Sequence, residues 1–426
     1  MKKILSSSLL LIMFSLALSA QDKTAVICGN LITAEDNTVR ANMVVIVEAE
    51  RIVQIGSKEI IKSDYKIIDL TGYTVMPGLI DAHVHPLIYG DDYQVNHIKG
   101  SSAFNALRGL KVVQNWLNEG WTSIRVAGDA DTQYAHFEIR DAINAGLFDG
   151  PRIFGAGHYL SVTGGGGDIN FIAPEQSVIA DGLVVDGKDE IQKAIRNEIK
   201  YGSDWIKILI TGAFMSEGDN PQNIQFSDEE IIAAVEEATR RGVPVMAHAH
   251  ATEGINKAIK FGAISIEHGT FLNDESIDLF LEHDAYLIPT LSVAEYGLQT
   301  WKNSKAQSKM YDLTIKHRKE SSIMYAKAIA RGVKVGVGSD NVGFPPNFAG
   351  KEFQFLTEIG MTPIQAILAG TKVNAELLRM DDEIGSIKVG KLADIIATKK
   401  NPIDDISELT RVAFVMKGGK IIKPIK

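Results

Sequence analysis

The sequence predicts an α/β protein, a (β/α)₈ TIM barrel joined to a small composite β-sandwich that the N- and C-terminal segments form together. Three observations support this fold class. Apolar, strand-like runs alternate with amphipathic stretches from about residue 75 to 382, as in βα units around a parallel sheet. Short β-branched runs occupy both ends of the chain. The length of 426 residues exceeds a barrel of about 250 to 300 residues and leaves room for a smaller unit.

The composition is that of a folded globular protein. Hydrophobic residues make up 45% of the chain and charged residues 23%, enough for a large core. The formal net charge is −9, and Lys and Arg do not cluster, so we expect no nucleic-acid partner. The single cysteine, Cys28, excludes an internal disulfide.

The first twenty residues have the pattern of an export signal. Two lysines precede an apolar run at residues 4–18, and the small residues Ser19 and Ala20 follow. The run has about fifteen residues, whereas a spanning helix needs about twenty. We therefore expect residues 1–20 to be a signal peptide and the mature protein to be periplasmic or secreted, with no stable membrane insertion after cleavage. A retained membrane anchor is the alternative, because Leu18 departs from the small residue expected at that position.

The predicted β-sandwich comprises residues 21–76 and 383–426. Its expected strands share alternating, β-branched sequences with Gly or charged residues between them. They are Met43–Val47, Arg51–Ile55, Lys66–Leu70, Ala393–Thr398 and the hairpin Phe414–Ile422, where Lys417, Gly418 and Gly419 supply the turn.

The predicted barrel comprises residues 77–382. Its eight expected strands are Leu79–Val84, Ser123–Ala127, Arg152–Gly155, Trp205–Ile210, Val243–Ala247, Ser265–Glu267, Ala285–Pro289 and Val333–Gly338. Helices fit between them. Ser227 and Glu230 predict a capping box that opens a helix running to Arg241, and Gly242 ends it.

Two histidines stand at the end of the first expected barrel strand. His83 and His85 follow the apolar run that starts at Gly78. Residues two apart on a strand point to the same side, so both imidazoles can hold one cation. Two unrelated polar residues at a strand end are the alternative.

A lone cation, Lys207, interrupts an apolar strand. A buried, unpaired ammonium group costs several kcal/mol, so its charge must be paired or removed. Burial lowers the pKa of lysine, and the free amine can add carbon dioxide to become an anionic carbamate that bridges two metals. A lysine paired with a carboxylate, or one that points to the rim, is the alternative.

Further candidate ligands follow later strands, at the face where barrels build their active sites. His248, His250 and His268 end two successive strands, although each alone could be a satisfied core histidine. Asp340 ends the eighth. A carboxylate there can touch a metal and accept a proton as general base, with a helix N-cap as its competing role.

Together these residues resemble those of the amidohydrolase superfamily, and the resemblance extends over the whole mature chain. The matching motifs are Val75–His85, Lys207, His248, His268, Asp340 and the ending Gly385–Ile395. The resemblance implies a binuclear centre in which His83, His85 and Asp340 hold one divalent ion. It implies that His248 and His268 hold the other, with carboxylated Lys207 bridging them and zinc as the expected metal.

Within the superfamily the chain is similar to the imidazolonepropionase-related group that includes Xaa-Pro (prolidase-like) dipeptidases. This similarity rests on three short sequence segments, Trp205–Lys207, His248–His250 and Ser265–Gly269. Those dipeptidases have a Thr-Gly-Gly-His-Gly-Asp loop, whereas residues 163–168 here read Thr-Gly-Gly-Gly-Gly-Asp. A histidine associated with the substrate carboxylate is therefore missing. The resemblance gives His250 a substrate-binding role, and His158 is a candidate replacement for the lost side chain.

We therefore expect a metal-dependent hydrolase of a small-molecule amide, either a peptide or an N-acyl amino acid. A hydroxide shared by the two metals attacks the carbonyl, and Asp340 moves the proton to the leaving nitrogen. The alternatives are a cyclic-amide hydrolase or deaminase, a lactonase or esterase, and an exported binding protein without turnover. Substrate identity and assembly into a homo-oligomer stay open.

Overall fold

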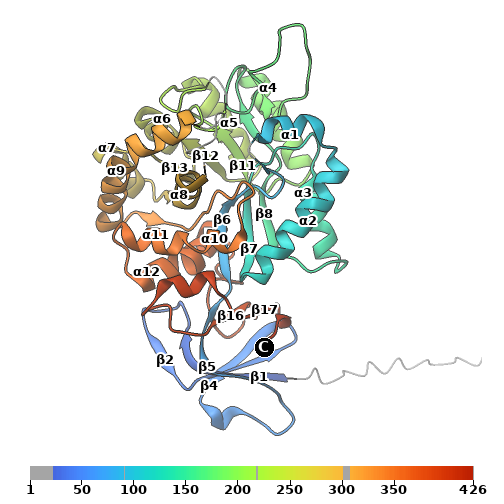
Figure 1. The fold of residues 1–426 in the computed structure, drawn as a ribbon, viewed down its shortest axis with the longest axis vertical. Coiled ribbons are helices and arrows are strands. Elements are labelled where there is room, and N and C mark those ends of the chain that lie inside the picture. The colour runs from blue at the N-terminus through green and yellow to red at the C-terminus, as the bar shows by residue number, and fades with distance from the viewer. Residues whose placement is uncertain (1–22, 91, 217–218, 301–307, 426) are drawn as a thin grey trace, which may run out of the picture.

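The computed structural model describes residues 23–90, 92–216, 219–300 and 308–425, and the signal peptide expected at residues 1–20 lies outside them. Figure 1 shows a helix-rich part around central strands and, beside it, a part made mainly of β-sheet. The two parts are joined by β5 (Lys66–Pro77), which leads through Gly78 alone into β6 (Leu79–Val84). No helix in these described ranges is long and apolar enough to cross a membrane.

Strands from both ends of the chain pair in one mixed sheet of eight strands, in the order β18-β17-β16-β5-β1-β3-β4, with β2 paired to β1. Besides β5, they are β1 (Lys23–Ile32), β2 (Val39–Ala41), β3 (Val44–Glu48), β4 (Arg51–Gly56), β16 (Ile395–Thr398), β17 (Phe414–Lys417) and β18 (Lys420–Lys423). The predicted hairpin turn is confirmed: Gly418 (φ 52°) and Gly419 (φ 73°) adopt the left-handed conformation that a two-residue turn requires. The second layer that would make this sheet a sandwich stays a prediction.

Each of the eight predicted barrel strands is present. They are β6, β7 (Trp121–Ala127), β8 (Arg152–Ala156), β11 (Ile206–Leu209), β12 (Val245–Ala249), β13 (Ser265–His268), β14 (Tyr286–Ile288) and β15 (Lys334–Val335). All neighbouring pairs among them are parallel, and β11, β12 and β13 are buried throughout. Burial on both faces explains why their sequences are almost continuously apolar.

Strand pairing divides these eight strands between two sheets rather than one continuous ring. One sheet has the order β6-β7-β8, and the other has β10-β9-β11-β12-β13-β14-β15, where β9 (Tyr159–Ser161) and β10 (Leu183–Val184) are additions. Backbone hydrogen bonds join the sheet edges at two places. Ala82 N donates to Val337 O at 2.9 Å, and Trp205 N donates to Gly155 O at 3.2 Å. Within the three-stranded sheet, the pairing register of β6 and β7 shifts between Asp81 and Val84, the mark of a local irregularity.

Helices follow the strands in sequence and surround them (Figure 1). They are α1 (Tyr93–Lys99), α2 (Ser102–Asn118), α3 (Ala135–Asn144), α4 (Lys188–Lys200), α5 (Asp228–Arg240), α6 (Thr252–Lys260), α7 (Asp274–Glu282), α8 (Leu291–Thr300), α9 (Ser308–Arg331), α10 (Pro346–Ala349), α11 (Glu352–Glu358), α12 (Pro363–Leu368) and α13 (Asn374–Leu377). The predicted capping box of Ser227 and Glu230 opens α5, and Gly242 follows its end at φ 74°. The alternation of strand and helix brings the carboxyl ends of the parallel strands to one face.

Candidate metal centre

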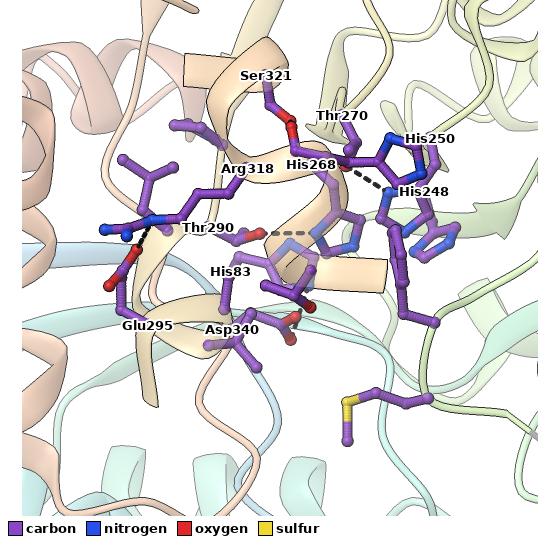
Figure 2. A pocket seen from close by; sticks show the side chains of 18 of the residues that line it. His83, His248, His250, His268, Thr270, Thr290, Glu295, Arg318, Ser321 and Asp340 are labelled. Atoms are coloured by element: carbon purple, nitrogen blue, oxygen red, sulfur yellow. Dashed lines mark hydrogen bonds and ion pairs between the residues drawn. The ribbon is translucent and has the colours of Figure 1, made fainter. Parts of the chain in front are cut away.

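The predicted site residues meet at the carboxyl ends of the strands. They line one cavity of about 980 Å³, and the set is His83, His85, Lys207, His248, His250, His268 and Asp340. Figure 2 shows the labelled histidines and Asp340 converging from different elements. Asp340 starts no helix, so the N-cap alternative does not describe it. Residues up to 257 positions apart are thus brought to a single site, because each one lies on or shortly after a strand of the same parallel set.

The first group of metal donors is His83, His85 and Asp340. Nε2 of His85 lies 3.3 Å from Nε2 of His83 and 3.2 Å from Oδ1 of Asp340, and Nε2 of His83 lies 3.5 Å from the same oxygen. Tetrahedral coordination at about 2.0 to 2.2 Å places ligand atoms roughly 3.3 to 3.6 Å apart. The three atoms therefore have the spacing that a shared cation such as zinc requires.

The second group of donors is His248, His250 and His268. The rings of His248 and His268 lie 4.6 Å apart between centroids, and His250 stacks on His268 at 4.7 Å. The resemblance implies that His248 and His268 are ligands and assigns His250 to the substrate. The structure adds that His250 also offers a donor atom within reach of the other two, which strand alternation alone could not show.

Lys207 lines the same cavity as the two groups and is 2% exposed. Burial lowers its pKa to about 8, so the reactive free amine is accessible near neutral pH. Within the described ranges the ammonium group forms no ion pair. The alternative of a lysine in a close ion pair with a carboxylate is therefore absent from the described ranges, although Glu267 and Asp340 attract its charge from further away. A chemical change at Nζ that removes the charge would lower the cost of its burial.

The electrostatics of the site favour neutral imidazoles and an ionised carboxylate. Burial lowers the pKa of His83 to about 4 and that of His248 to about 3, and the positive charge of Lys207 adds to both effects. Burial raises the pKa of Asp340, but nearby His83 and His85 outweigh it and bring the value to about 2. Neutral histidine and anionic aspartate are the forms that bind metals.

A buried chain of polar groups fixes the first histidine. Nδ1 of His83 donates to Oε2 of Glu267 at 2.6 Å, and Nη2 of Arg125 donates to Oε1 of Glu267 at 2.9 Å. His83 is 1% exposed and the other two are fully buried. Because a carboxylate only accepts, Nδ1 carries the proton and Nε2 of His83 keeps its lone pair for a metal.

Sequence reasoning assigned no role to Glu267 or Arg125. A signal for them existed, because each is a lone charge in an apolar strand, as Lys207 is. Two opposite lone charges on buried strands need each other as partners. Applying the same argument to all three residues would have identified the pair, although not its contact with His83.

The other histidines are oriented by oxygen atoms in the same way. Nδ1 of His85 donates to Gly128 O at 2.6 Å, Nδ1 of His268 contacts Thr290 Oγ1 at 2.6 Å, and Nδ1 of His250 contacts Thr270 Oγ1 at 2.7 Å. The Nε2 atom of each of these three histidines is therefore the nitrogen available to a ligand in the cavity. His248 differs, because its Nε2 contacts Gly212 O at 3.2 Å and Nδ1 is the remaining donor.

Two of the candidate ligands have unusual backbone conformations. His268 has φ 70° and Asp340 has φ 50°, values in the left-handed region that residues other than glycine adopt uncommonly. The carbonyl of His268 accepts a hydrogen bond from the hydroxyl of buried Tyr325 at 2.9 Å. This contact helps α9 hold the strained segment in place.

The glycine loop at residues 163–168 reaches the cavity, but His158 does not replace the missing histidine. Gly166 lines the cavity of the metal centre, and its carbonyl accepts a hydrogen bond from Ser216 at 2.6 Å. His158 lines a separate cavity of about 560 Å³. Its ring nitrogens contact Glu198 Oε1 at 2.9 Å and Asp131 O at 3.1 Å. Both nitrogens are therefore occupied by structural contacts, and the suggested compensation is wrong.

Comparison with known proteins identifies the family of this chain. The sequence profile of the amidohydrolase family matches residues 74–422. Ochratoxinase from Aspergillus niger is 32% identical over 440 aligned residues, which cover 96% of this chain and 88% of that protein. Imidazolonepropionase from Cutibacterium acnes is 25% identical, over 84% of this chain and 83% of the relative.

A solved structure of a Xaa-Pro dipeptidase with bound methionine in its active site is 36% identical. It superimposes with a TM-score of 0.88, covering 94% of this chain and 99% of the other. The agreement extends over nearly the whole chain, so it includes the mixed sheet as well as the parallel strands.

Proposed function

The chain belongs to the amidohydrolase family and is a metal-dependent hydrolase of carbon–nitrogen bonds; within that class we propose that it hydrolyses the amide bond of a dipeptide or an N-acyl amino acid at a binuclear metal centre. The observation that carries this proposal is the pair of donor groups, each of three side chains, beside buried Lys207 at one cavity. The dipeptidase and ochratoxinase relatives support an amide over other carbon–nitrogen bonds.

The donor atoms fit two divalent cations, with zinc as the proposed metal. His83, His85 and Asp340 would hold one ion, and His248 and His268 the other, with carboxylated Lys207 between them. When bound, such ions supply Lewis acidity, which polarises a carbonyl group and makes water a stronger acid. The spacing of the first donor group and the lone charge of Lys207 support this arrangement.

Asp340 acts as the general base and acid. Its carboxylate accepts the proton that water loses as the water oxygen bonds to the carbonyl carbon, and it returns that proton to nitrogen as the carbon–nitrogen bond breaks. Its position beside His83 and His85 supports this role. His250 orients the substrate through its remaining ring nitrogen, since Thr270 engages the other.

Two finer structural features belong to the same proposal. The sheets β6-β7-β8 and β11 to β15 form the wall of one (β/α)₈ barrel, supported by the backbone hydrogen bonds that join their edges. The mature protein starts at Gln21 after export to the periplasm or medium. Intact mass measurement of the protein recovered from the periplasmic fraction tests the cleavage site.

The function is tested by incubating the mature protein, reconstituted with zinc and bicarbonate, with a library of dipeptides and N-acyl amino acids and measuring released amine. Release by the wild type that is lost in Asp340→Asn supports the proposal. Absence of release with about two metals bound per chain would contradict it and direct the search to cyclic amides, lactones and esters. Full activity of Lys207→Met with one bound metal would favour a mononuclear deaminase instead.

A further inference from the structure

Helix α9 contributes a buried tyrosine to the cavity wall beside the metal centre. Tyr325 is 4% exposed and lines the cavity. Its hydroxyl donates to the carbonyl oxygen of His268 at 2.9 Å. The same hydroxyl forms a hydrogen bond with the side chain of Thr270, two residues further along the chain. Tyr325 therefore contacts the segment after β13 at two points.

Thr270 connects this tyrosine to His250. Oγ1 of Thr270 lies 2.7 Å from Nδ1 of His250, and Figure 2 shows the two side chains next to each other. A chain of hydrogen bonds therefore runs from His250 through Thr270 and Tyr325 to a backbone carbonyl. The direction of each bond in this chain decides which ring nitrogen of the imidazole has the proton.

Only one direction is consistent with all three bonds. A carbonyl oxygen only accepts, so the single hydroxyl proton of Tyr325 points to His268. The bond between Tyr325 and Thr270 must then use the hydroxyl proton of Thr270. Because that proton is engaged, Oγ1 of Thr270 has only lone pairs to offer, and Nδ1 of His250 must donate to it.

The imidazole of His250 is held in this orientation as a neutral ring. His250 is 5% exposed, and the ion pairs that histidines form among the described residues do not include it, so a charged ring would be strongly disfavoured. The ring stacks on His268 at 4.7 Å and meets the edge of Phe214 at 4.7 Å. A neutral ring with its proton on Nδ1 has a free lone pair on Nε2.

We propose that Tyr325 is a positioning residue that acts through Thr270 to keep the proton of His250 on Nδ1, so that Nε2 accepts a hydrogen bond from an N–H group of the substrate. The inference rests on the proposed amide hydrolysis and narrows its substrate class. The ring of His250 lies 4.5 Å from that of His248 and 4.7 Å from that of His268, the proposed ligands of one ion beside the substrate carbonyl. The favoured substrates are therefore secondary amides, whose nitrogen has a hydrogen next to that carbonyl, rather than tertiary amides such as prolyl bonds.

The position of the proton can be measured directly. Nitrogen NMR of the mature protein with isotope-labelled histidine distinguishes the two neutral tautomers, and the signals of His250 are those that His250→Gln lacks. In the wild type, with and without zinc, we expect the form protonated on Nδ1 alone. Tyr325→Phe frees the hydroxyl of Thr270 to donate to Nδ1, so the form protonated on Nε2 is expected to appear.

Three further variants separate this role from general stability. Thr270→Ser keeps the hydroxyl and should keep the wild-type tautomer, whereas Thr270→Val should give a mixture. Tyr296→Phe is the matched control, because Tyr296 packs against Phe344 and is not among the residues that line the cavity. A loss of Tm alone does not select a tautomer. A wild-type His250 protonated on Nε2, or an unchanged tautomer in Tyr325→Phe, would overturn the inference.

Binding tests the acceptor role without turnover. In an Asp340→Asn background, calorimetric titration compares an N-acyl amino acid with its analogue methylated at the amide nitrogen. We expect the secondary amide to bind about fivefold more tightly, the net value of one neutral hydrogen bond, and Tyr325→Phe to remove most of this difference. This preference would support the inference even if the wild type releases no amine. Equal affinities for the two ligands would reject the acceptor role even if hydrolysis is observed.

Discussion

Three charged side chains, Arg125, Lys207 and Glu267, interrupt buried strands. They differ in whether each has an ion-pair partner. Arg125 and Glu267 neutralise each other at 2.9 Å, and Arg125 also lies over the ring of Trp205 at 4.6 Å. Lys207 has no such partner in the described ranges. A fully buried ion pair is stabilised by the attraction between its two charges. A buried ammonium group without such a partner loses its proton more easily, and the free amine can then react. This difference supports a structural role for the pair and a metal-bridging role for Lys207.

The general base can be tested at the level of one atom. Asp340→Asn keeps the size of the side chain but removes its ability to accept a proton, so amide hydrolysis should fall by about 10² to 10⁴-fold. Initial rates are measured beside metal content per chain. Wild-type rates in the variant, at wild-type metal content, would rule out Asp340 as the base.

Glu267→Gln is expected to weaken both the fold and the metal site. The change leaves Arg125 buried without its ion-pair partner, which costs about 3 to 5 kcal/mol of unfolding free energy. It also removes the carboxylate that orients His83, which lowers metal affinity about 10- to 100-fold. Denaturant unfolding and a zinc competition titration measure the two effects.

The matched control for that variant is Glu275→Gln. Glu275 pairs with Lys260 at 2.9 Å on the surface, where its side chain is 57% exposed, and such a pair contributes less than about 1 kcal/mol. Equal losses of unfolding free energy in the two variants would show that the buried ion pair contributes no more to stability than the exposed one.

At the scale of elements, contacts among β13, α8 and α11 hold one wall of the cavity beside the metal centre. His268 ends β13 and contacts Thr290, and α8 begins at the next residue. Glu352 of α11 holds the first turn of α8. A change in any of these contacts should therefore alter substrate binding as well as local stability.

The anchor of α8 should make stability depend on pH. Burial raises the pKa of Glu352 from its ordinary value of 4.5 to about 8. The folded protein then binds more protons at this group than the unfolded chain does, so its contribution to stability is complete below pH 4.5 and is lost as pH rises through 8. Glu352→Gln, which stays neutral, is expected to become more stable relative to the wild type between pH 5 and pH 9.

Chemical denaturation of the metal-free wild type and Glu352→Gln at pH 5, 7 and 9 measures this difference. A tenfold difference in proton affinity between the folded and unfolded states corresponds to about 1.4 kcal/mol of unfolding free energy. A stability difference that is the same at all three pH values would contradict the role assigned to Glu352.

At the scale of the whole molecule, the donor groups connect the two parallel sheets. His83 belongs to the three-stranded sheet, whereas His248 and His268 belong to the seven-stranded sheet, and Asp340 follows the last strand of the latter. Ions bound to these residues would link the two sheets, which share no continuous strand pairing. Metal binding and global stability should therefore be coupled.

Removal of metal by a chelator is expected to abolish hydrolysis and to lower Tm by a few degrees, because free ion at 100 times its Kd contributes about 2.7 kcal/mol. Zinc together with bicarbonate should restore both properties in the wild type. In Lys207→Met the bicarbonate requirement should disappear along with the second metal. A Tm and activity unaffected by complete metal removal would contradict the proposed centre.

The sequence by itself determined the order of strands and helices, the pairing of both chain ends in one sheet, and the residues that could bind metal. These features are local, since apolar periodicity defines a strand and the residue at its carboxyl end occupies the common face. Only the tertiary structure decided the pairing of His83 with Glu267, 184 residues away, the position of His250 among the donors, and the rejection of His158 as a replacement for the missing loop histidine. These depend on contacts between loops, helices and strands remote in sequence, whose relative positions no local pattern encodes.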